Sequence, residues 1–188
     1  HDVDACTAAL VEISEADPDE RAWQITLERV LTREGRSADL EALLRRVLSR
    51  TTAGAERERL RLELSKLHRA AQDLDGALRE LLPLFEDGGN HPAAWSMALL
   101  LASGLGDEMV RADALSRLAQ PLSPSLRAVV TSCAAESWLL AGDLNRARAS
   151  AEQASHVDPS LTRPVAVLAQ IALLSGPTTE AAVAIERA

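Results

Sequence analysis

The residue types that most often carry enzyme chemistry are sparse and scattered in this sequence. The histidines and the two cysteines do not fall at metal-ligand spacing, and neither an H-E-x-x-H nor a C-x-x-C motif occurs. The Gly88-Gly89 pair is not followed by the Lys-Ser/Thr pair of a phosphate-binding loop, and no serine stands in a nucleophile-elbow context. We therefore expect no catalytic, metal-binding or cofactor-binding residues, and no enzyme activity.

The individual residues that invite a chemical role have simpler structural interpretations. His68 is interpreted as a packed or edge residue rather than a base. The two cysteines, Cys6 and Cys133, are interpreted as small buried residues, since free cysteine is among the most buried residue types. Packing between helices, rather than an aromatic ligand box, is the interpretation for all three tryptophans: Trp23, Trp95 and Trp138.

The composition favours an all-α fold and excludes two classes of function. Alanine and leucine dominate, tyrosine is absent, and there is one phenylalanine, so the residues that strands prefer are scarce. The net charge of −8 argues against nucleic-acid binding, which needs a basic surface. No apolar run approaches the roughly 20 residues of a membrane span, so direct membrane insertion is not expected.

The clearest element is a helical hairpin in residues 128–161. Its first half repeats apolar or small residues at helical spacing: Val130, Ala134, Ala135, Trp138 and Leu139. Gly142 and Asp143 then end one helix and begin another, because glycine suits the C-terminal turn and aspartate the N-cap. The second helix carries its own small and apolar positions before a terminal Asp-Pro: Leu144, Ala147, Ala151 and Ala154.

This hairpin resembles the tetratricopeptide repeat, a helix–turn–helix unit of about 34 residues. The matching positions are the small residues of both helices, the aromatic of the first helix and the terminal proline: Ala135, Trp138, Ala147, Ala154 and Pro159. The small position of the second helix recurs along the chain at Cys6, Leu40, Ala77, Arg111, Ala147 and Ala181. Because Arg111 is charged, we expect Ala112 to take its place through a one-residue slip.

The resemblance implies a right-handed α-solenoid of antiparallel helix pairs, a superhelix formed by a single array over residues 1–188. We expect a half repeat in 1–18, a partial repeat in 162–188 and four repeats between them: 21–54, 58–91, 92–125 and 128–161. The first helices are expected at 21–33, 58–70, 92–104, 126–140 and 162–175. Since the chain opens inside one repeat and shows no polar capping helix, we expect a fragment of a longer array.

In this family the first helices of successive repeats line a concave groove that binds partner proteins. The helical period places eight candidate binding residues on that face: Arg29, Arg33, Arg59, Lys66, Arg69, Met97, Leu100 and Leu139. The five cations predict a partner protein or peptide with an acidic segment. The alternative is that they pair with neighbouring glutamates, such as Glu28 or Glu63, and only solvate the surface.

We therefore interpret the chain as a protein–protein interaction scaffold. One alternative is a regulatory or sensory module that packs against its own neighbouring domain in a larger protein. A more remote alternative is a small-ligand or catalytic domain. The preference for arginine over lysine favours a bacterial source, and the cytoplasm is slightly favoured over the periplasm as its location.

Overall fold

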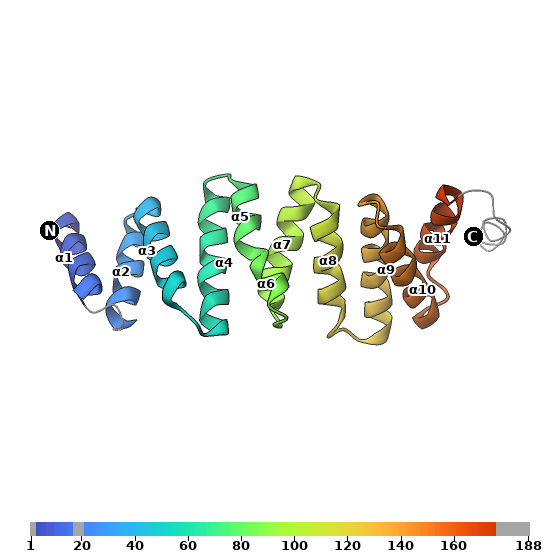
Figure 1. The fold of residues 1–188 in the computed structure, drawn as a ribbon, viewed down its shortest axis with the longest axis horizontal. Helices are drawn as coiled ribbons and strands as arrows, with labels where there is room; N and C mark the ends of the chain where they lie inside the picture. The colour runs from blue at the N-terminus through green and yellow to red at the C-terminus, as the bar shows by residue number, and fades with distance from the viewer. Residues whose placement is uncertain (1–2, 17–20, 176–188) are drawn as a thin grey trace. The chain divides into compact units, whose positions relative to one another are not determined.

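The computed structural model describes residues 3–16 and 21–175, where all regular secondary structure is helical (Figure 1). The helices are α1 (Val3–Ala16), α2 (Arg21–Arg33), α3 (Ser37–Arg50), α4 (Gly54–Ala70), α5 (Leu74–Leu81), α6 (Pro83–Glu86), α7 (Pro92–Leu105), α8 (Glu108–Ala119), α9 (Pro124–Leu140), α10 (Leu144–Val157) and α11 (Thr162–Leu174). The first helices of the repeats are α2, α4, α7, α9 and α11. The all-α prediction is therefore confirmed, and the first helices lie where the sequence pattern puts them.

Four turns between first and second helices share one hydrogen-bond pattern. In each, a residue with positive φ is followed by one whose N–H bonds to the carbonyl five residues back, at 2.9–3.0 Å. The donors are Arg36, Asp73, Asp107 and Asp143. This is the Schellman arrangement that ends helices on a left-handed residue. Glycine takes that position in three turns, and Gln72, with φ of 63°, takes it in the fourth.

The same four turns confirm the repeat spacing. Four positions further along the chain, a second residue donates its N–H to the backbone carbonyl of each of these donors. These second residues are Leu40, Ala77, Arg111 and Ala147. They are the positions that mark the second helix of each repeat in the sequence. The described helix pairs therefore have a tetratricopeptide-like fold. The predicted slip is also confirmed, because Ala112 is fully buried while Arg111 pairs with Glu108 at the surface.

The second helices begin with aspartate caps in three repeats. Asp107 accepts a hydrogen bond from the Val110 N–H, and Asp143 accepts one from the Arg146 N–H. Asp73 accepts from the Gly76 N–H at 2.8 Å. Each bond satisfies one of the free donors of a first helical turn. The second helix of residues 58–91 departs from the pattern, because Pro83 lacks an N–H and divides it into α5 and α6.

The chain divides into two compact units, His1–Glu80 (unit 1) and Leu81–Ala188 (unit 2). Unit 1 has a leucine core: Leu10, Leu27, Leu31, Leu40, Leu43, Leu44, Leu60 and Leu64. Unit 2 has a core of alanines around one tryptophan and two aliphatic residues: Ala112, Ala134, Ala135, Trp138, Ala147, Ala151, Val167 and Ile171. Whether both units belong to a single array over residues 1–188 stays a prediction, as do the repeat boundaries. The positions Gly176, Ala181 and Ile185 lie outside the described residues.

Two burial predictions are wrong. Cys6 is exposed and Cys133 is only partly buried, whereas both were expected inside. In α1 the neighbouring Thr7 is buried instead, which shifts the inward face by one residue. Among the tryptophans, Trp95 and Trp138 are buried as packing residues, but Trp23 is 40% exposed. The leucines of α2 already fill the space beneath that helix, so its tryptophan remains at the surface.

Candidate functional site

The five predicted binding cations all lie on the first helices of unit 1. Arg29 and Arg33 are exposed on α2, and Lys66 and Arg69 are exposed on α4. Arg59 is only half exposed, near the start of α4. We call the exposed residues of the first helices that follow this helical spacing the first-helix stripe. In unit 1 this stripe is basic, in a chain whose net charge is negative.

Arg59 is held between α2 and α4 by two carboxylates. Its guanidinium lies 2.9 Å from Glu28 Oε1 on α2 and 2.9 Å from Glu56 Oε1 on its own helix. Partial burial disfavours the charged form, but the hydrogen bonds to Glu56 and Glu28 outweigh burial and raise the pKa of Arg59. The charge is therefore largely satisfied within the chain, and Arg59 acts first as a link between helices.

Pairing also engages Lys66, whose Nζ lies 2.7 Å from Glu63 Oε1. The alternative of pairing with Glu28 and Glu63 is thus confirmed for Arg59 and Lys66. Arg33 is 88% exposed, and its Nε lies 3.9 Å from Glu34 Oε1, which makes a weak ion pair at an exposed position. Arg29 makes no ion pair within the described residues. The charge most available to a partner is therefore that of α2.

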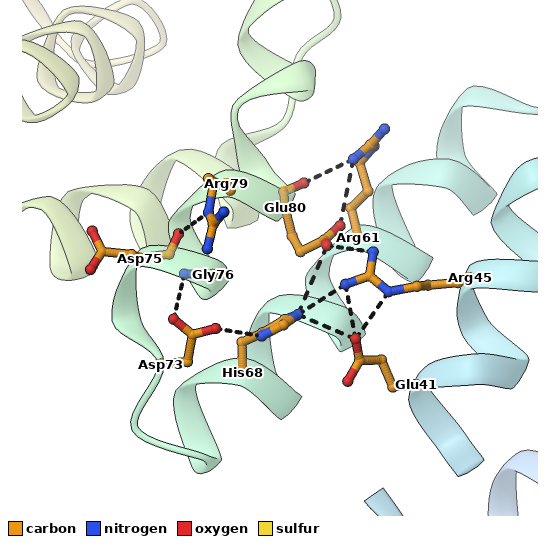
Figure 2. A network of polar contacts seen from close by, with 9 residues as sticks. All are labelled: Glu41, Arg45, Arg61, His68, Asp73, Asp75, Gly76, Arg79 and Glu80. Atoms are coloured by element: carbon orange, nitrogen blue, oxygen red, sulfur yellow. Dashed lines mark hydrogen bonds and ion pairs between the residues drawn. The ribbon is translucent and has the colours of Figure 1, made fainter. Parts of the chain in front are cut away.

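His68 lies near the end of α4 with a polar contact at each ring nitrogen (Figure 2). Nδ1 is 3.0 Å from Asp73 Oδ2, at the start of α5, and Nε2 is 3.2 Å from Arg45 Nη2 on α3. Nδ1 therefore lies beside a carboxylate of the α4–α5 turn, and Nε2 lies beside a guanidinium of α3. These contacts confirm that His68 is a packed residue between helices.

Glu80 on α5 completes this network. Its Oε1 lies 2.9 Å from Arg45 Nη1, and its backbone carbonyl accepts from Arg61 Nη1 at 3.2 Å. Arg45 also pairs with Glu41, one turn earlier on α3, at 2.9 Å (Figure 2). The hydrogen bond to Glu41 and the charge of Glu80 raise the pKa of Arg45, against the opposing effect of burial. The network fastens α3, α4 and α5 together.

In unit 2 the first-helix stripe is apolar rather than basic. Leu100 on α7 is 58% exposed and Leu140 on α9 is 65% exposed, and Val129 on α9 is also exposed. Met97 is partly buried, and Leu139 packs against the alanine core, so neither offers the surface that Leu100 does. On α9, Leu140 is therefore the exposed neighbour of the predicted Leu139.

The stripes of α9 and α11 lie side by side. Arg163, at the start of α11, donates to the Cys133 sulfur and lies 3.6 Å from Glu136 Oε2 on α9. Cys133 and Glu136 share a helical face with Val129 and Leu140, because these positions are three or four residues apart. The exposed surface of α9 therefore continues onto α11 through Arg163.

The described residues hold no cluster of three or more His, Cys, Asp or Glu side chains that could bind a metal ion. Within that same part of the chain, none of the helices combines the length and apolar character needed to cross a bilayer. His91 contacts Asp87, at 2.9 Å, and packs edge-on against Trp95. Like His68, it is engaged in structural contacts.

Sequence reasoning missed two features. The first is the Arg45–Glu80 link, since no periodic pattern joins residues 35 positions apart, although Glu41 and Arg45 stand at the i, i+4 spacing of a helix pair. The second is a basic pocket that includes Arg46 and Arg50. Its signal was the pair of arginines one turn apart on a second helix, directly before Thr51 and Thr52.

No protein-family model matches the sequence, and no curated protein matches it. Among solved structures, a tetratricopeptide repeat protein from Parabacteroides merdae is 14% identical with a TM-score of 0.47, over 87% of this chain and 63% of that one. A structure of MamA is 15% identical with a TM-score of 0.44, over 84% and 89%. BtubC from P. vanneervenii is 16% identical with a TM-score of 0.44, over 98% and 86%. The chain thus spans less than two thirds of the first of these proteins, and the likenesses concern helical arrangement at low sequence identity.

Proposed function

We propose that the chain is an interaction scaffold that binds a segment of another protein on its first-helix stripes. The observation that carries the proposal is the exposure of large aliphatic side chains on α7 and α9, namely Leu100, Val129 and Leu140. A partner that covers these aliphatic side chains removes apolar surface from water, and this favours binding. The basic stripe of α2 and α4, in unit 1, would attract an acidic segment of a partner.

A test of the charge belongs on α2, where the cations are least engaged. The double variant Arg29→Glu with Arg33→Glu reverses two exposed charges on one stripe. The matched control, Arg79→Glu with Arg148→Glu, makes the same charge change on exposed positions of second helices α5 and α10. We expect weaker capture of an acidic partner by the stripe variant alone, and a loss that grows at low salt, because exposed charges are screened over about 8 Å at physiological ionic strength.

The apolar test replaces Leu100 and Leu140 with serine. Leu139 is unsuitable because it packs against the core, so its replacement would also lower stability. The control replaces Met109 and Val157, two exposed apolar residues of second helices α8 and α10. The expected result is a loss of capture in the stripe variant with little salt dependence, at unchanged helicity by circular dichroism.

The measurement is affinity capture with the purified chain, followed by mass spectrometry and titration of each captured protein against the four variants. A captured protein counts as a stripe partner only if a stripe variant weakens its binding and the matched control does not. If every captured protein binds all four variants equally, the proposal is wrong and the interaction surface lies elsewhere.

A regulatory module remains the second candidate, since the same stripes could be covered by a neighbouring domain of a longer chain. Adding such a domain as a separate polypeptide would then compete with the captured partner for the stripe. The coarser role, binding another protein through helical repeats, is common to both candidates.

A further inference from the structure

A basic pocket opens in unit 1, away from the first-helix stripes. It has a volume of about 300 Å³ and is lined by the start of α2, the second half of α3 and the connection between α3 and α4. A volume of this size is at the small end of the range for small-molecule sites. The pocket shares no residue with the predicted binding cations.

Three arginines line this pocket: Arg21, Arg46 and Arg50. The carboxylate among the lining residues is Glu56, and it is already shared between Arg21, at 2.6 Å, and Arg59, at 2.9 Å. Burial disfavours the charged carboxylate, but the hydrogen bonds and charges of Arg59 and Arg21 together outweigh burial and lower the pKa of Glu56. Glu56 is therefore ionised and engaged by those two arginines, and it does not compensate the charge of Arg50.

Arg50 makes no ion pair or side-chain hydrogen bond within the described residues, although it ends α3 at the pocket. Thr52, beside it in the lining, likewise has a hydroxyl with no hydrogen bond to the described part of the chain. Guanidinium groups recognise carboxylate and phosphate oxygens through paired N–H donors, and a hydroxyl adds a further donor. The pocket thus holds donors that protein atoms do not use.

The rest of the lining adds an apolar side and more donors. Leu43 and Val47 from α3 give the pocket its apolar wall, and Gln24 lines it from α2. Ala53, the residue before α4, also lines it and offers no side chain to cap the first turn of that helix. The backbone donors at the start of α4 therefore add to the positive potential that the arginines create.

We propose that this pocket binds a small organic anion, with its phosphate or carboxylate group at Arg50 and Thr52 and its carbon skeleton against Leu43 and Val47. The site gives the scaffold a small-ligand function that is independent of the first-helix stripes. A ligand bound there contacts α2, α3 and the start of α4 at once, so its binding stabilises unit 1 in proportion to its concentration.

Isothermal titration calorimetry with two probes tests the site, using pyrophosphate for the phosphate group and citrate for the carboxylate group, at constant ionic strength set with sodium chloride. We expect at least one probe to bind, and the stronger of the two identifies the anion class. Arg50→Gln should weaken that probe about tenfold or more, since hydrogen bonds to charged groups are the strong ones. Arg148→Gln, on exposed α10, is the control and should bind as the unchanged chain does.

Amide chemical shifts measured on the unchanged chain provide a second readout that needs no variant. Titration with the bound probe should move the signals of Arg50 to Glu56 first, and leave those of α10 in place. The proposal is overturned if neither probe binds at millimolar concentration, if Arg148→Gln loses as much affinity as Arg50→Gln, or if the shifts centre outside the pocket. Since Arg50 and Thr52 lie outside the stripes, loss of the anion site leaves partner capture unaffected, and the reverse also holds.

Discussion

Units 1 and 2 build the same helix pairs from different residues. In unit 1 the helices meet through leucines, and arginines link neighbouring helices by pairing with carboxylates, as Arg59 does with Glu28 and Arg45 with Glu80. In unit 2 the helices meet through alanines, and two arginines lie over aromatic rings, while Arg163 pairs with Glu136 between α11 and α9. Arg117 lies 5.1 Å from the centre of the Phe85 ring, and Arg146 lies 4.7 Å from that of Trp138.

This difference shows that the repeat determines the path of the backbone but not which side chains fill the space between its helices. Leucine side chains hold two helices further apart than alanine side chains do, so each unit needs a set of contacts suited to its own spacing. Arg59 and Arg45 reach between helices in unit 1, whereas the small residues of unit 2 let Trp138 and the backbones pack directly. Buried positions of the second helices should therefore require large side chains in unit 1 and small side chains in unit 2.

The largest expected effect is in the leucine core. Leu44 is 1% exposed, and Leu44→Ala removes a side chain that its neighbours cannot replace. We expect a loss of about 2–5 kcal/mol in the free energy of unfolding. Urea denaturation measures it, and because alanine is a better helix former than leucine, a loss reports the cavity rather than helix propensity. A loss below about 1 kcal/mol would contradict a tightly filled leucine core.

The opposite substitution should be harmful in unit 2. Ala147 is fully buried where α9 and α10 pack, so Ala147→Leu forces the helices apart, at a cost of about 1–3 kcal/mol. Ala149, two residues along α10, is exposed, and Ala149→Leu should be nearly silent. Thermal unfolding of the two variants compares them directly. Equal changes in Tm would mean that the register of α10 is not the one described.

A smaller effect is expected at Gly76, in the first turn of α5. Alanine normally favours a helix over glycine by up to about 1 kcal/mol. A Cβ at this position would instead collide with the Asp73 carboxylate and lie 2.8 Å from His68 Nδ1, which would push apart the two groups that join α4 to α5. Gly76→Ala should therefore lower Tm, contrary to helix propensity.

Gly54 provides the matched control for that substitution. It lies in the first turn of α4, and a Cβ there would meet no atom within 4 Å. Gly54→Ala should leave Tm unchanged or raise it slightly. If both glycine substitutions raise Tm, the contact between Asp73 and His68 does not constrain the turn in solution.

Much of the fold could be predicted from sequence because its signals are local. Glycine and aspartate at the turns and small residues at helical spacing located the first helices and identified Asp143 as a cap. Contacts between distant residues have no such signal. The break at Pro83 could be read from the proline alone, but the exposure of Cys6 and Trp23 depends on which side chains fill the neighbouring space.

The candidate binding residues show the same limit. Helical periodicity placed Arg29, Arg33 and Leu100 on an exposed face, since exposure along one helix follows its period. It could not tell that Arg59 is used by Glu28 on another helix, or that Leu139 rather than Leu140 packs inward. Both outcomes are decided by partners that lie on neighbouring helices.

The smallest expected effect concerns acid stability at the α4–α5 turn. The hydrogen bond from the Gly76 N–H is the main cause that lowers the pKa of Asp73 in the folded chain. Desolvation opposes it, and the hydrogen bond from His68 adds to the lowering. A carboxylate with a lowered folded-state pKa stabilises the fold above its unfolded-state pKa, near 3.9, and this contribution is lost as pH falls through the folded-state value.

Asp73→Asn can still cap α5 but carries no charge. The difference in unfolding free energy between the unchanged chain and Asp73→Asn should therefore be constant near neutrality and shrink at acid pH. Urea denaturation of both proteins from pH 7 down to about pH 3 measures that difference, and subtracting the two curves cancels the carboxylates they share. A difference that stays constant over the whole range would show that the Asp73 charge does not contribute to the link between α4 and α5.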